Sequence, residues 1–260
     1  MRNKYKGLSK DEIYLISRAE FEKQTLITTA FVQKVFEQKN KASRVLVYLQ
    51  RKGRVLRIER GKYLLVPLKA PNQSWTPNEF LVASLWMGES PYYIGYSSAY
   101  NYWGFTEQIP QTISVLNTRK GLKKLIGKLS YRLVKVSSQK IYGLQKNNID
   151  GGSFFISDKE RTLVDFIYKP MGSWGNVEDI IKGQLSEINV EKLVRYLIRF
   201  PVVSVRKRAG FILQKLGVSQ KLLVPLQASI GKENTYIVFN PFIKSRKGKV
   251  DSGWKVIING

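Results

Sequence analysis

The sequence predicts an α+β protein with two domains, and three observations carry this prediction. The chain has 260 residues, a length that suits two domains or one domain with a substantial extension, and 43% of them are apolar, enough for ordinary cores. Near the N-terminus, apolar residues recur at helical spacing and are followed by two short alternating runs. Farther along, β-branched alternating runs give way to a helical end. A connector at residues 70–76, rich in loop formers, divides a first domain (1–70) from a second (77–260).

Two helices are expected before residue 38. Ser9 and Glu12 make a capping box for a helix reaching Phe21, whose core-facing residues are Ile13, Ile16 and Ala19. Thr28 or Thr29 caps the second helix, in which the apolar stripe consists of Phe31, Val32, Val35 and Phe36.

A third helix is expected after a polar turn, Gln38-Lys39-Asn40, with Asn40 as its N-cap. This helix has two distinct faces at helical spacing. The apolar face consists of Ala42, Val45, Leu46 and Leu49. The polar face consists of Lys41, Arg44, Tyr48 and Arg51.

A hairpin is expected after the third helix, which Gly53 ends. The two strands are residues 54–58 and 62–66, joined through Glu59-Arg60-Gly61, where glycine suits a tight turn. Two helices joined by a short turn and followed by a hairpin indicate a winged helix-turn-helix. In such a domain one helix enters the major groove and the hairpin forms a wing.

The charge of this segment agrees with its spacing. Between Lys39 and Lys62 there are nine basic residues and a single acid, Glu59, a net charge of +8. Such a surface attracts phosphates, so we expect double-stranded DNA as the partner. A solvated basic face on an ordinary helical hairpin is the alternative. The predicted DNA-binding residues are Lys39, Lys41, Ser43, Arg44, Tyr48, Arg51, Arg54, Arg57, Arg60 and Lys62.

The composition restricts the chemistry. The net charge of +25 favours nucleic acid as a partner, ahead of a membrane surface or an acidic protein. The sequence has no cysteine and no histidine, which removes disulfides, thiolate zinc sites and the commonest general base. No apolar run reaches transmembrane length. We therefore expect a cytoplasmic protein that is not an enzyme and needs no cofactor or metal.

The second domain is expected to begin with a helix that has Pro77 in its first turn. Strands are expected at residues 92–94, 112–116, 131–136, 141–144 and 154–156. A short helix capped by Ser97 or Ser98 should end at Gly104. The aromatic residues between Tyr92 and Phe105 favour a core with a polar rim, with base stacking as the alternative.

Two further basic zones follow. From Gln108 to Ile149 there are nine basic residues and no acid, and residues 119–128 are expected to form an exposed loop or short helix. The second zone lies between Glu191 and Glu233, on helices expected to start at Asn189 and Ser204. The tail is irregular, with strand-like runs at residues 235–239 and 254–259.

A second capping box, Ser157 to Glu160, begins a helix whose apolar residues Leu163, Val164, Phe166 and Ile167 point inward. The carboxylates Asp158, Glu160 and Asp165 are candidates for a metal or acid/base site. The favoured interpretation is structural, because carboxylates in a first helical turn stabilise the helix dipole.

Four blocks together resemble one family: Arg60-Gly61-Lys62-Tyr63, YYIGYSSAYNYWGFTEQIP, FFISDKERTLVDFIYKP and DSGWKVIIN. In this order and spacing the chain resembles AbiEi proteins, the antitoxin and transcriptional-regulator half of type IV abortive-infection toxin–antitoxin systems. The resemblance covers nearly the whole chain. It implies an N-terminal winged helix, an α/β C-terminal domain and repression of the protein's own operon through promoter repeats.

The resemblance also implies that the protein counters a nucleotidyltransferase-type toxin without requiring a stable complex. The C-terminal helices are more basic than expected for the family, which leaves a stand-alone winged-helix regulator as an alternative. An RNA-binding accessory protein that uses the aromatic block is another alternative, and a metal-dependent nuclease that uses Asp158 or Asp165 is a third.

Overall fold

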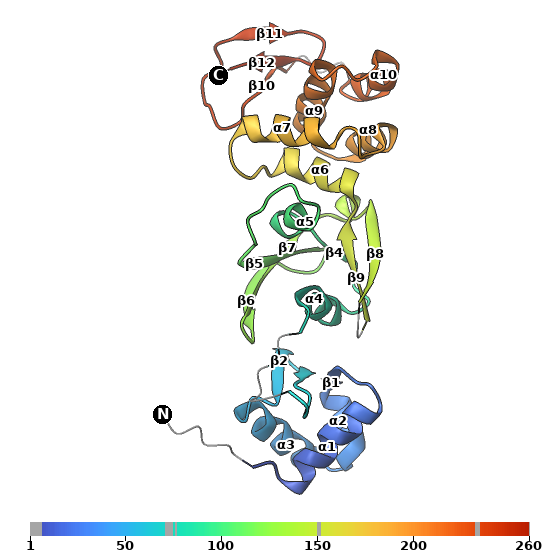
Figure 1. Cartoon of the computed structure of the whole chain (residues 1–260), viewed down its shortest axis with the longest axis vertical. Helices are drawn as coiled ribbons and strands as arrows, with labels where there is room; N and C mark the ends of the chain where they lie inside the picture. Colours follow the sequence, from blue (N-terminus) through green and yellow to red (C-terminus); the bar gives the residue numbers. More distant parts are fainter. Residues whose placement is uncertain (1–6, 71–74, 76, 150–151, 232–234, 260) are drawn as a thin grey trace. The chain divides into compact units, whose positions relative to one another are not determined.

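The computed structural model describes residues 7–70, 75, 77–149, 152–231 and 235–259 (Figure 1). Helices and β-sheets both contribute to the fold, which confirms the α+β class. Contacts within the chain divide it into two compact units. The first unit takes in Met1–Glu89, Lys123–Tyr131 and Asn148–Phe154, and the second takes in Ser90–Leu122, Arg132–Asn147 and Phe155–Gly260. The connector predicted at residues 70–76 falls largely outside the described residues.

Helix α1 (Lys10–Phe21) begins with the predicted capping box. The Ser9 hydroxyl accepts the Glu12 N–H at 3.3 Å, and the Glu12 carboxylate accepts the Ser9 N–H at 2.6 Å. The prediction that Ile13 faces the core is wrong, because its side chain is 46% exposed. The buried stripe is Leu15, Ile16 and Ala19, and Ile13 lies roughly a third of a turn from its centre.

Helix α2 (Thr29–Phe36) is capped by Thr28, whose hydroxyl accepts the Phe31 N–H at 3.1 Å. Strand β1 (Leu26–Thr28) immediately precedes it and was not predicted, because three residues are too few to show a period. The predicted N-cap of the next helix is wrong. Helix α3 (Lys39–Arg51) starts one residue before Asn40, after Glu37 has turned the chain at a φ of 59°.

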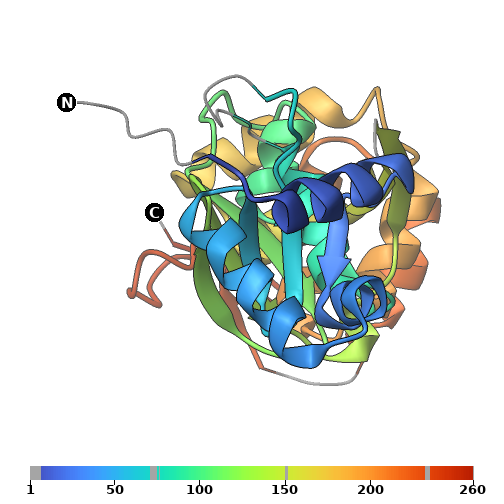
Figure 2. The same cartoon turned by 90° about the horizontal axis from the view of Figure 1, so that it is seen from below.

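The predicted hairpin is present as β2 (Val55–Glu59) and β3 (Lys62–Leu65), with Gly61 at a φ of 78° in the turn. Strand β3 pairs antiparallel with both β1 and β2, giving a three-stranded sheet in the order β1-β3-β2. Helices α1, α2 and α3 gather against this small sheet (Figures 1 and 2). Their shared core includes Leu15, Ile16, Val32, Leu46, Leu49, Val55 and Leu65.

Helix α4 (Glu79–Met87) is capped by the Asn78 side chain, so Pro77 precedes the cap and does not lie in the first turn. A six-stranded sheet has the strand order β6-β7-β5-β4-β9-β8. Its strands are β4 (Tyr92–Ile94), β5 (Thr112–Asn117), β6 (Leu122–Ile126), β7 (Leu129–Lys135), β8 (Leu144–Ile149) and β9 (Gly152–Ser157).

Three local predictions in this region are wrong. Residues 122–126 form strand β6 instead of a loop or helix, because Gly127, at a φ of 60°, turns the chain back into β7. The strand expected at residues 141–144 starts only at Leu144, after the 3₁₀ turn Ser138–Lys140. Helix α5 (Ser97–Tyr102) has Tyr96 as its N-cap and no capping side chain.

The second unit ends in helices and a small sheet. The helices are α6 (Lys159–Tyr168), α7 (Trp174–Gln184), α8 (Val190–Arg199), α9 (Val203–Lys215) and α10 (Gln220–Ala228). Asn189 caps α8 as predicted, whereas α9 follows Val202 and is not capped by Ser204. Strands β10 (Ile237–Val238), β11 (Lys249–Asp251) and β12 (Val256–Ile258) form a sheet in the order β10-β12-β11. None of the helices in the described ranges is long and apolar enough to span a bilayer.

Candidate nucleic-acid interface

The two faces of α3 are separated as the sequence predicts. Ala42, Val45, Leu46 and Leu49 are buried in the core of the first unit. Opposite them, Arg44 and Arg51 are exposed, and the Tyr48 ring is 45% exposed. Lys39 and Ser43, at the start of the helix, are also exposed. Burial of the apolar stripe therefore holds α3 so that its basic residues face solvent.

Lys41 differs from its neighbours on this helix because it has a partner. Its Nζ lies 2.9 Å from Oδ1 of Asp11, on α1, and 5.1 Å from the centre of the Phe36 ring. This half-buried ion pair offsets the charge that Lys41 would otherwise present to a phosphate. No local pattern in the sequence indicates this pairing, because the two residues lie on different helices.

The basic residues of the hairpin also fall into two groups, those that are exposed and those that have a partner within the chain. Arg57 and Arg60 are exposed. Arg54 is half-buried, and its guanidinium donates to the Pro67 carbonyl at 3.4 Å. Lys62 lies 3.0 Å from the Glu59 carboxylate. Arg57 and Arg60 are therefore the wing residues whose charge is available to a ligand.

Lys52, which contributes to the basic count of the segment, has a structural role. Its Nζ lies 2.6 Å from the buried Glu12 carboxylate and donates to the Gly7 carbonyl at 2.8 Å. Within the described residues, no carboxylate lies at ion-pair distance from Lys39, Arg44, Arg51, Arg57 or Arg60. These five cations are therefore the members of the predicted set that are exposed and have no carboxylate partner among the described residues.

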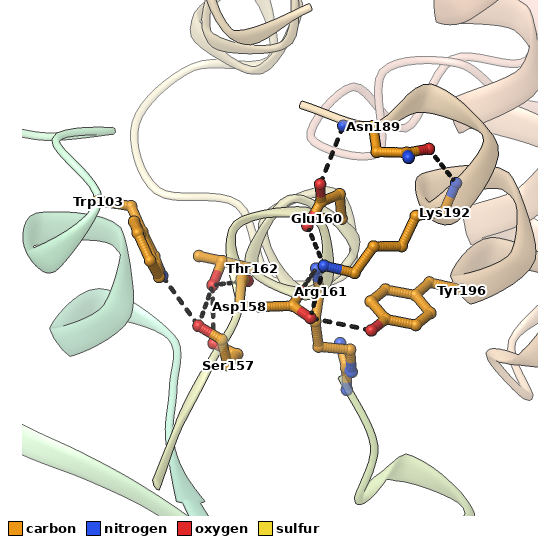
Figure 3. A network of polar contacts seen from close by, with 9 residues as sticks. All are labelled: Trp103, Ser157, Asp158, Glu160, Arg161, Thr162, Asn189, Lys192 and Tyr196. Atoms are coloured by element: carbon orange, nitrogen blue, oxygen red, sulfur yellow. Dashed lines mark hydrogen bonds and ion pairs between the residues drawn. The ribbon is translucent and has the colours of Figure 1, made fainter. Parts of the chain in front are cut away.

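The carboxylates at the start of α6 belong to a polar network (Figure 3). Asp158, and not the predicted Ser157, is the N-cap, and its Oδ1 accepts the Arg161 N–H at 2.8 Å. Its Oδ2 accepts the Tyr196 hydroxyl at 2.9 Å and lies 3.1 Å from Lys192 Nζ. Ser157 instead accepts the Trp103 indole N–H at its carbonyl, at 2.8 Å.

Glu160 completes this network. Its carboxylate accepts the Asn189 N–H at 2.9 Å and the Lys192 ammonium at 2.8 Å. Burial acts to raise the pKa of Glu160, but these two donors hold the pKa below its ordinary value. Asp158 and Glu160 therefore both pair with Lys192, which links the start of α6 to α8.

The third carboxylate candidate, Asp165, lies in a different environment. It is buried beside Arg161, 2.7 Å away, and accepts the Tyr93 hydroxyl at 3.1 Å. Among the described residues, no three acids gather in a way that could hold a metal ion. The geometry supports the structural interpretation of Asp158, Glu160 and Asp165.

The aromatic block belongs mainly to the core, as predicted. Tyr92, Tyr93, Tyr100 and Phe105 are all at most 5% exposed. Tyr102, at 42%, is the member that faces solvent most openly among those in the block. A row of exposed rings for stacking bases is therefore not present in this part of the chain.

The two further basic zones differ from each other. In the first, Arg119, Lys123, Lys128, Arg132 and Lys135 are exposed. In the second, Lys207 is only 1% exposed and donates to the Thr235 carbonyl at 2.6 Å. Arg206 and Arg208 donate to the carbonyls of Ser229 and Val238. Three cations of α9 therefore hold backbone segments together.

No protein-family model and no curated protein matches the chain. A solved structure does. The fold is similar to that of the RV2827C protein from Mycobacterium tuberculosis. The TM-score is 0.65 at 15% sequence identity, and the match covers 96% of this chain and 92% of that one. At this identity the similarity concerns the fold alone.

Proposed function

We propose that the N-terminal elements form a winged helix-turn-helix that binds double-stranded DNA, with α3 as the recognition helix and β2–β3 as the wing. The order α1-β1-α2-α3-β2-β3 supports this assignment, as does the small antiparallel sheet. The observation that carries it is the face of α3. Arg44, Tyr48 and Arg51 are exposed on a helix whose opposite side is fixed in the core.

Each element has its own task in this proposal. Arg44 and Arg51 hydrogen-bond base edges or phosphates in the major groove, where arginine pairs with guanine in a bidentate way. Arg57 and Arg60 reach the backbone or the adjacent minor groove from the wing. Lys41 and Lys62 contribute less, because each has an acidic partner 2.9 Å and 3.0 Å away.

The biological role rests on the resemblance to AbiEi proteins. We propose that the chain is a cytoplasmic repressor that binds repeats in its own promoter and acts as the antitoxin of a type IV module, and that it is a binding protein without catalytic activity. A stand-alone regulator without a toxin is the second candidate. Its support is the basic C-terminal half, which departs from the family. The burial of the aromatic block favours DNA over single-stranded RNA, because it leaves few rings for stacking.

The test is binding of a fluorescent duplex carrying the region upstream of the gene, measured by anisotropy over a series of salt concentrations. We expect log K to fall steeply with log salt for the wild type. Arg44→Ala should make the slope shallower by about 0.9 if Arg44 contacts a phosphate. If Arg44 instead reads a base, affinity for the promoter should fall by about 1–3 kcal/mol without a similar loss on random DNA.

Arg18→Ala is the matched control, because it removes the same charge from an exposed position on α1 that is already paired with Glu22. A wild type that does not bind the duplex, or that binds it without salt dependence, would refute the proposal. Equal losses in the Arg44 and Arg18 variants would refute the assignment of α3. The antitoxin role has a separate test, in which a nucleotidyltransferase encoded beside the gene is expressed and growth is measured. Rescue of growth by the wild type and by Arg44→Ala alike would support this role independently of DNA binding.

A further inference from the structure

The second unit contains a pocket of about 320 Å³ that the proposed DNA-binding function does not use. It lies beside α5, β5, β7 and the segment that follows α6, and Figure 1 shows α5 packed against β5. Its volume is at the lower end of the range of small-molecule sites, roughly 300–1,000 Å³. The pocket is therefore large enough for a small ligand.

The charged residues that line the pocket are all basic. Arg132 and Lys169 line it, and none of the described residues that line it is acidic. Within the described part of the chain, neither cation has a carboxylate at ion-pair distance. Both side chains are exposed, and two cations without acidic partners beside one cavity favour an anion there.

Hydroxyl groups add hydrogen-bond capacity to this charge. Tyr96 and Ser97 line the same pocket. Burial raises the pKa of the Tyr96 hydroxyl, which therefore stays protonated and able to donate. Val134 and Met171 line another part of the pocket and provide apolar surface for an organic group.

The backbone of Tyr96 is strained. Its φ is 50° with a ψ of −138°, a conformation that glycine adopts at no steric cost. For a tyrosine this conformation is sterically unfavourable, and residues held in such conformations cluster at ligand sites. The strained position nevertheless carries a large side chain, and that side chain lines the pocket.

We propose that this pocket binds a small phosphate monoester, with the phosphate between Arg132 and Lys169, hydrogen bonds from Tyr96 and Ser97, and the organic part against Val134 and Met171. This site is separate from the DNA-binding face and does not depend on it. It gives the chain a means of sensing a phosphorylated metabolite.

The chain offers a specific probe, because it contains three methionines and Met171 is the one that lines the pocket. Full-length protein labelled with [¹³C-methyl]methionine would be titrated with AMP at about 0.15 M salt, where exposed charges are screened. Met171→Leu assigns the signal. We expect a saturable shift of the Met171 methyl, while the methyl of Met87, on α4, stays unchanged.

Three comparisons make this test decisive. Arg132→Ala and Lys169→Ala should each weaken binding by about tenfold or more. Lys135→Ala removes the same charge from an exposed position on β7 outside the pocket and should leave binding unchanged. Inorganic phosphate should compete with AMP, whereas adenosine should neither compete nor shift the signal.

Several results would overturn the proposal. The first is a Met171 signal that does not move with AMP up to about 10 mM, far weaker than typical ligand affinities. The second is an equal loss of binding in the Lys135 variant, which would show that the net charge of the protein and not the pocket attracts the anion. A shift with adenosine equal to that with AMP would exclude phosphate recognition. A loss of DNA binding alone would leave this proposal standing.

Discussion

The Arg161 guanidinium and the Asp165 carboxylate lie 2.7 Å apart, one turn from each other on α6, and both side chains are at most 1% exposed. The rings of Tyr142 and Phe200 lie 4.7 Å and 5.2 Å from the guanidinium carbon. The Tyr93 hydroxyl donates to the carboxylate from β4. The pair is buried, and the Asp165 carboxylate neutralises the Arg161 guanidinium. This explains why an acid lies among the apolar residues in the second half of α6.

Removing one member of this pair should be strongly destabilising. Asp165→Ala leaves a buried guanidinium without its counter-charge, so we expect the free energy of unfolding to fall by about 3–5 kcal/mol. Urea denaturation measures it. Glu22→Ala, which removes the partner of exposed Arg18, should cost less than about 1 kcal/mol. A loss for Asp165→Ala as small as that of the control would contradict the structural role of the pair.

Gly210 on α9 should not tolerate a methyl group. A Cβ at this position would lie 2.0 Å from the ring of Trp254, which is completely buried. We expect Gly210→Ala to destabilise the protein by at least about 1–3 kcal/mol, because a packed core cannot absorb the added volume. Thermal unfolding measures the change.

Gly183 provides the matched control for this substitution. It also lies in a helix, α7, but a Cβ there would meet nothing within 4 Å. Gly183→Ala should therefore raise stability by about 0.4–1 kcal/mol through the lower entropy of the unfolded chain. Similar effects of the two substitutions would show that Trp254 does not pack on Gly210.

Asp11 should weaken DNA binding in the wild type. In the wild type the Lys41 Nζ lies 2.9 Å from the Asp11 carboxylate. Asp11→Ala frees Lys41 and removes a negative charge beside the proposed interface. We expect tighter binding and a salt slope steeper by about 0.9, the value for one more phosphate contact. Asp179→Ala gives the same change in net charge from an exposed site on α7. An equal gain in both variants would point to overall charge instead of Lys41.

The network around Lys192 should make stability depend on pH on the acid side. The pKa of Glu160 is lowered in the folded protein, so its contribution is present above about pH 4.5 and is lost as the pH falls through the lower folded value. Glu160→Gln should be less stable than the wild type at neutral pH, and the difference should shrink towards pH 3 or so. Urea midpoints at several pH values measure this. A constant difference across the range would exclude the ionised carboxylate as the cause.

Local signals in the sequence predicted most of the elements well. Ser9, Thr28 and Asn189 cap the helices assigned to them, because a capping side chain reaches only two or three residues along the chain. The hairpin after α3 and the strand at Tyr92–Ile94 are also where the pattern places them. Strands β1 and β11, which have three residues each, were not predicted.

The exposed face of α3 was predictable in its outline and not in its details. The periodicity of α3 identified which side chains leave the core, and the exposed positions of Arg44, Tyr48 and Arg51 agree with it. It could not show that Lys41 pairs with Asp11 or that Arg54 binds the Pro67 carbonyl. These partners lie 30 and 13 residues away, and no local pattern records them.

The sequence by itself determined the class of the fold, the two faces of α3 and the large positive charge, since each depends on residue type and spacing along the chain. Only the tertiary structure decided which charges remain available to a ligand. Lys41 and Lys192 meet carboxylates from other helices, whereas Arg132 and Lys169 line one pocket from separate elements. Folding brings these groups together across long stretches of chain, and electrostatic energy depends on their distance in space.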